Sequence, residues 1–252
     1  MTLEGLQAGI LLPAFAAGLL VLATHVPLGM EVLRRGIIFI DLAIAQIAGL
    51  GIVLAHVLGA EEQGWQVQAA AVGAALAGAL FLRWMEKRLP ERQEAVIGVT
   101  FAVAACAAIL LMSKDPHGAE HLKELLVGQI LWSTWEGLVP LALVSLAVLA
   151  GWYGLRLQSS PLGFYLLFAL TVTASVQVVG VYLVFASLIV PALAAGNRPG
   201  LAYALGAAGY GAGLIGSAVL DLPSGAAIVV ALALAAAGFA GPMGKRRAPG
   251  RA

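Results

Sequence analysis

The chain has 252 residues, of which 61% are hydrophobic and only 11% charged, and its mean hydropathy is +0.96. A water-soluble domain of this length carries about twice that share of charged residues. The composition therefore excludes a soluble globular domain, and the net charge of +1 says little about partners.

Apolar blocks of about 20 residues follow one another along the chain, each long enough to cross roughly 30 Å of hydrocarbon as a helix. The sequence predicts an all-α fold, a polytopic transmembrane helix bundle of about 8–9 spans. We expect these spans to form a single transmembrane domain over residues 1–252. In chain order they cover residues 6–26, 36–58, 65–83, 95–112, 127–155, 162–179, 180–196 and 201–220, and an apolar block at 224–242 makes a ninth.

Basic residues lie in alternate connections between these blocks. If nine spans alternate strictly, all of the 14 Lys and Arg residues except Lys114 and Lys123 fall on one side. Because cytoplasmic loops carry the excess of Lys and Arg, we predict a multi-pass protein of the cell inner (cytoplasmic) membrane with a cytoplasmic C-terminus. This topology explains the basic residues, so no nucleic-acid partner is indicated. It also requires a turn near residues 177–180, for which a partly re-entrant pair of short helices is the alternative.

One carboxylate, Asp41, lies inside the predicted span 36–58. An ionisable group in such a helix costs roughly 2.5–3.5 kcal/mol on insertion scales and is a functional-site candidate by default. The alternative is that Asp41 reaches the interface or pairs with Arg34 or Arg35. Glu136, near the start of the span 127–155, is a second buried-carboxylate candidate with the same interfacial alternative.

Four other residues could bind a metal. Gln46 and His56 lie on the same predicted helix as Asp41, although a histidine near a span end is more often at headgroup level. His117 and His121 stand four residues apart in an outer loop and could share a cation with Glu120 if that loop is helical. The alternative is a solvated polar loop. The candidate metal ligands are therefore Asp41, Gln46, His56, His117 and His121.

The sequence has no motif for catalysis or for a bound cofactor. No G-x4-G-K-[ST] run is present, so the chain does not itself hold ATP in a P-loop. Its single cysteine, Cys106, excludes an internal disulfide and a multi-cysteine zinc site. We expect no catalytic residues and no permanently bound cofactor.

Four segments between residues 27 and 234 form an ordered pattern. PLGMEVLRRGIIFIDLAIAQIAGLGI contains an arginine pair and, six residues beyond it, Asp41. WMEKR at 84–88 is followed by EAVIG at 94–98, and VVGVYLVFASLIVPALAAG and LDLPSGAAIVVALAL occupy 178–196 and 220–234. Taken together and in this order, these segments resemble the membrane subunit of zinc/manganese-type metal ABC transporters.

The resemblance implies a permease that moves a divalent metal ion, its transported substrate, across the cytoplasmic membrane by alternating access. It implies a separate cytoplasmic ATP-binding subunit, an extracytoplasmic metal-binding protein and a homodimer in the lipid bilayer. In this arrangement Asp41 offers a hard oxygen ligand on the metal path, with Gln46 or a group from a partner helix beside it.

The chain departs from the family pattern at two places. Ala45 stands where the family has a histidine, and the junction 156–161 is shorter than the cytoplasmic stretch that resembles a coupling helix in the family. Two alternatives therefore stay open beside the ATP-driven permease. One is a carrier or channel that works without an ATPase, and the other is a non-transporting membrane partner.

Overall fold

The computed structural model describes residues 8–61, 64–113, 115 and 118–244, and all of its regular elements in these ranges are helical. Short helical turns cover Pro90–Arg92, Ile130–Trp132, Ala150–Gly154 and Leu157–Ser159. The longer helices are α1 (Ala8–Arg35), α2 (Ile40–Val57), α3 (Trp65–Arg88), α4 (Gln93–Met112), α5 (Gly118–Val127), α6 (Leu138–Leu149), α7 (Pro161–Val179), α8 (Val181–Ala195), α9 (Pro199–Leu220) and α10 (Ser224–Gly244).

The predicted all-α membrane bundle is confirmed. Six helices in the described ranges are long and apolar enough to cross a membrane, and three shorter apolar helices, Leu138–Gly154, Val181–Ala195 and Ser224–Phe239, occupy the other predicted blocks. The turn predicted near residues 177–180 lies at Gly180, between α7 and α8. The chain is thus a multi-pass membrane protein.

Two of the predicted boundaries are wrong. The first helix does not end near Val26 but continues through Pro27 to Arg35, where Glu31 pairs with Arg34 and Arg35 and so supports the last turn. The block 127–155 is not one span, because Gly128 has a positive φ of 70° and ends α5. An irregular segment then precedes α6.

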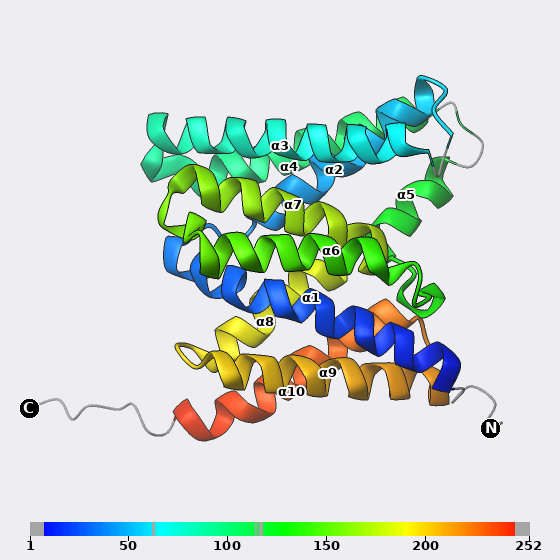
Figure 1. Cartoon of the computed structure of the whole chain (residues 1–252), viewed down its shortest axis with the longest axis vertical. Helices are drawn as coiled ribbons and strands as arrows, with labels where there is room; N and C mark the ends of the chain where they lie inside the picture. The colour runs from blue at the N-terminus through cyan, green and yellow to red at the C-terminus, as the bar shows by residue number, and fades with distance from the viewer. Residues whose placement is uncertain (1–7, 62–63, 114, 116–117, 245–252) are drawn as a thin grey trace, which may run out of the picture.

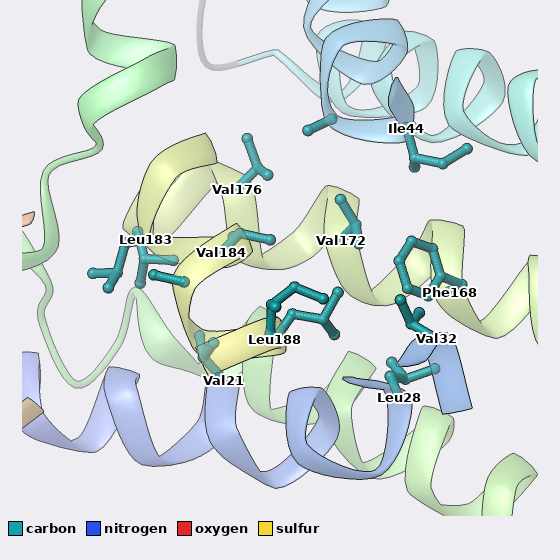
Figure 2. Close-up of a cluster of buried hydrophobic side chains, with 14 of the residues drawn as sticks. Val21, Leu28, Val32, Ile44, Phe168, Val172, Val176, Leu183, Val184 and Leu188 are labelled. Atoms are coloured by element: carbon teal, nitrogen blue, oxygen red, sulfur yellow. The ribbon is translucent and has the colours of Figure 1, made fainter. Parts of the chain in front are cut away.

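The core lies where α1, α7 and α8 pack together. Figure 2 shows a part of it, in which side chains of these three helices and of α2 converge. The helix α7 is the most buried of the six candidate spans in the described ranges. The labelled members of this cluster are Val21, Leu28, Val32, Ile44, Phe168, Val172, Val176, Leu183, Val184 and Leu188.

Small residues let neighbouring helices approach closely. A Cβ on Gly209 or Gly213 of α9 would collide with Leu232 or Ile228 of α10. This G-x3-G pair is therefore used for helix packing inside the chain, as small residues commonly are in membrane helices.

The connections α1–α2, α3–α4 and α6–α7 meet at one end of the bundle, which we call the basic end. In Figure 1 the last turns of α10 lie toward this end, and α5 and the first turns of α1 lie toward the other. Three hydrogen bonds link these connections: Arg35 Nη2 to the Gln158 carbonyl oxygen (3.4 Å), Phe39 N to Glu94 Oε1 (3.2 Å) and Gln93 Nε2 to Tyr165 Oη (2.7 Å).

Candidate functional site

One face of α2 lines two adjoining cavities. Positions 45, 49, 52 and 56 are spaced by three or four residues and so share one side of the helix. Asp41 lies on the same side, one turn before Ala45, but lines neither cavity. Ala45, Gln46 and Gly49 line a cavity of about 830 Å³ between α2, α4, α5, α8 and α10. Farther along α2, Ile52 and His56 line a second cavity of about 280 Å³. Leu125 and Val176 line both cavities, which are therefore neighbours along the same helix.

Asp41 lies in the first turn of α2, at the basic end and one helical turn from Ala45. Its side chain is 1% exposed, and neither carboxylate oxygen has a hydrogen-bond partner of good geometry among the described residues. The nearest groups that favour its charge are the backbone N–H groups of Asp41 and Leu42, as expected at a helix N-terminus.

The alternative pairing of Asp41 with Arg34 or Arg35 is not what the structure shows. Arg34 and Arg35 both contact Glu31, each with an N–O distance of 2.6 Å. The Arg35 guanidinium also lies 4.0 Å from the centre of the Phe164 ring. These contacts occupy the two arginines at the end of α1, so Asp41 is a buried carboxylate without a counter-charge among them.

Gln46 is one of the few polar groups in the larger cavity, whose lining is mostly apolar. The described polar residues beside it there are Lys123 and Tyr182. A mainly apolar cavity with a few convergent polar groups is the usual form of a binding site.

His56 lies at the far end of α2, in the smaller cavity with Gln129 and Gln177. Its Nε2 atom is 3.6 Å from Asp115 Oδ2. His117 lies outside the described residues, and the side chain of His121 is not described, so the predicted sharing of a cation is untested. The helix α5 begins at Gly118, directly after His117, and contains residue 121.

The structure does not gather Asp41, Gln46 and His56 into one centre. No group of three or more His, Cys, Asp or Glu side chains that could hold a metal occurs in the described part of the chain. Asp41 and His56 are 15 residues apart on one helix, or about 22 Å at 1.5 Å per residue. Asp41, Gln46 and His56 therefore mark successive positions along α2.

Two ionisable residues were missed from the sequence. Glu94 lies in the first turn of α4, next to Asp41, and His25 lies in α1 with 0% exposure. His25 Nδ1 is 2.8 Å from the Val21 carbonyl oxygen, and Nε2 has no partner among the described residues. The rule that selected Asp41, that an ionisable group inside an apolar span is costly, could have found His25. Glu136, in contrast, is exposed and is not a buried carboxylate.

Comparison with known proteins identifies the family and the fold of the chain. The family described as the ABC 3 transport family matches residues 7–153 and 147–239. PsaBC from Streptococcus pneumoniae, solved in complex with Fab, is similar with a TM-score of 0.70 and 20% identity, over 95% of this chain and 95% of that chain. An inward-facing conformation of a metal-chelate type ABC transporter is similar with a TM-score of 0.56 and 16% identity, over 93% of this chain and 84% of the other.

At these identities the two solved structures show a shared fold, whereas the family match covers most of the chain. The ordered segments between residues 27 and 234 indicated the same relationship. The chain belongs to the ABC 3 transport family and is the membrane-spanning subunit of an ABC transporter.

Proposed function

We propose that the chain carries a divalent metal ion of the zinc/manganese type across the cytoplasmic membrane, along the cavity-lined face of α2. The observation that supports this most is Asp41, a buried carboxylate at the basic end of that face that has no side-chain counter-charge among the described residues. An uncompensated charge in an apolar helix is costly and marks an ion path more often than a structural role.

The path would begin at the smaller cavity beside His56, pass Gln46 and end at Asp41. Alternating access would open the two ends in turn. The chain would bind the cation transiently as substrate and would keep no permanent cofactor.

The proposed partners follow from the family. A separate cytoplasmic subunit would hydrolyse ATP, an extracytoplasmic metal-binding protein would deliver the ion, and two copies of the chain would form a homodimer. In this assembly the basic end and the C-terminus face the cytoplasm, since Lys and Arg concentrate on that side of a membrane.

The experiment that tests the function is an uptake assay in cells that lack their own metal importers. Cells that express the chain together with a candidate ATPase and binding protein should accumulate radioactive Mn²⁺ or Zn²⁺ faster than cells without the chain. Equal accumulation of both ions in the two strains would contradict the proposal.

A carrier that works without an ATPase is the second candidate, and the α6–α7 connection favours it. This connection contains only the short turn Leu157–Ser159 before α7 begins at Pro161. Stable protein interfaces bury on the order of 1,200 Å² or more in total, and so short a segment offers little of that area.

If an ATPase binds, we expect its contact to lie at the α3–α4 connection. Arg88 and Arg92 are exposed there, and the Arg88 guanidinium lies 5.2 Å from the Trp84 ring centre. Reversing both charges with Arg88→Glu and Arg92→Glu should lower recovery of the ATPase in co-purification, because rim charges guide association. Arg156→Glu, at the exposed α6–α7 connection, is the matched control and should have a smaller effect.

Two outcomes of this co-purification would change the interpretation. A robust complex that is indifferent to reversal at Arg88 and Arg92 would refute the relocated contact. Failure of the unmodified chain to bind any candidate ATPase would favour the carrier.

A further inference from the structure

Glu94 lies beside Asp41 although 53 positions separate them in the sequence. Its Oε1 atom accepts a hydrogen bond of 3.2 Å from the backbone N of Phe39, the residue that precedes α2. The Glu94 carboxylate is close enough to Asp41 to act on it electrostatically. The first turns of α2 and α4 thus bring two negative groups together at the basic end.

Three oxygen atoms of this pair lack a side-chain partner among the described residues. Asp41 Oδ1, Asp41 Oδ2 and Glu94 Oε2 are buried and accept no hydrogen bond of good geometry from the described residues. Arg34 and Arg35, the basic residues that precede α2, are paired with Glu31. Burying like charges without a counter-ion is expensive, and a bound cation would offset this cost.

We propose that Asp41 and Glu94 together form an inner binding site for a hard divalent cation such as Mn²⁺. The inference rests on the proposed function for the route by which the cation arrives, and it adds a second ligand and a cation class. Both side chains offer only carboxylate oxygens, which suit Mn²⁺ and Mg²⁺ better than softer ions.

Two carboxylates are enough for a cation that keeps part of its water shell. Ala45, one turn beyond Asp41, is a methyl group that faces the larger cavity and offers no ligand atom. A small hard cation is often held by one or two carboxylates, with waters as the remaining ligands. The site therefore needs no third protein ligand.

Mn²⁺ binding to the purified full-length chain in detergent tests this site. Free Mn²⁺ is measured by its electron paramagnetic resonance signal, and thermal unfolding is followed with and without Mn²⁺. Glu94→Gln should weaken Mn²⁺ binding at least tenfold, since even outer-shell partners of a metal ligand are worth 10–100-fold in affinity. It should also abolish the Mn²⁺-dependent rise in unfolding temperature that the unmodified chain shows.

The matched control is Glu91→Gln, the same chemical change at an exposed residue three positions earlier. It should bind Mn²⁺ like the unmodified chain. Without metal, Glu94→Gln should unfold at the same temperature as the unmodified chain or higher, because it removes one of two neighbouring negative charges. If Glu94→Gln fails to fold, Glu94→Asp replaces it and should fold and bind Mn²⁺ more weakly, since its carboxylate is withdrawn by one methylene.

Several results would overturn the inner site. The first is Mn²⁺ binding that is undiminished in both Glu94→Gln and Glu94→Asp. The second is equal Mn²⁺ binding by the unmodified chain and by a double variant with Asp41→Asn and Glu94→Gln. The third is no Mn²⁺ binding by the unmodified chain. Undiminished binding by the two Glu94 variants does not contradict the proposed function if Asp41 is still needed for metal uptake. Glu94-dependent Mn²⁺ binding in a chain that supports no metal uptake would instead retain the site and refute the proposed function.

Discussion

Asp41→Asn is expected to abolish metal uptake while leaving the chain folded and in the membrane. The substitution keeps the shape of the side chain but removes its charge and one strong oxygen ligand. Because Asp41 is 1% exposed and lacks a side-chain counter-charge among the described residues, neutralising it lowers a burial cost and should not reduce stability. We expect uptake to fall by about 100-fold or more, the upper range for lost support of a metal site.

The measurement pairs initial uptake of radioactive Mn²⁺ and Zn²⁺ with the amount of folded protein in the membrane. Asp221→Asn is the matched control, because Asp221 is exposed at the end of α9 with a positive φ of 53°, a conformation that asparagine also tolerates. It should transport normally. Wild-type uptake by Asp41→Asn would remove this residue from the mechanism.

Gly180→Ala is expected to have the largest effect on stability. Gly180 joins α7 to α8 with φ of 79° and ψ of 164°, a backbone region that is essentially limited to glycine. A Cβ there would also collide with the backbone of Val127 and Gly128, and a Cβ on Gly128 would collide with Val179. Backbone strain and overpacking together should lower the free energy of unfolding by on the order of 3 kcal/mol.

Thermal unfolding in detergent and the monodisperse fraction on size exclusion measure this effect. For a chain of this size, the expected loss corresponds to a fall of about 6–12 °C in the unfolding midpoint. Gly36→Ala is the control, since Gly36 also has a positive φ, of 72°, but no atom lies within 4 Å of its added Cβ. The Gly36→Ala variant should lose only about 1 kcal/mol of its free energy of unfolding. Equal losses for the two variants would show that the close backbone contact contributes little.

The helix boundaries show where local sequence information is sufficient. The spans near α2, α4, α7, α8 and α9 were placed within a few residues of their observed bounds, because the need to bury backbone and apolar side chains in hydrocarbon acts on each segment separately. The first span was cut short at Val26 because its hydropathy falls there, although the helix continues to Arg35. A hydropathy pattern contains no information on the ion pairs of Glu31 that support this last turn.

Composition and charge distribution alone gave the membrane class, the nine apolar segments and Asp41 as an exceptional residue, since each depends on the cost of placing given side chains in lipid. Tertiary structure decided which groups meet. The pairing of Arg34 and Arg35 with Glu31 follows the i,i+3 and i,i+4 spacing within α1, whereas tertiary packing joins Glu94 to the start of α2. The last contact unites residues far apart in the chain, and no period or spacing within one helix encodes it. The inner carboxylate pair is therefore a product of how α2 and α4 pack, whereas its more buried member is visible in the sequence.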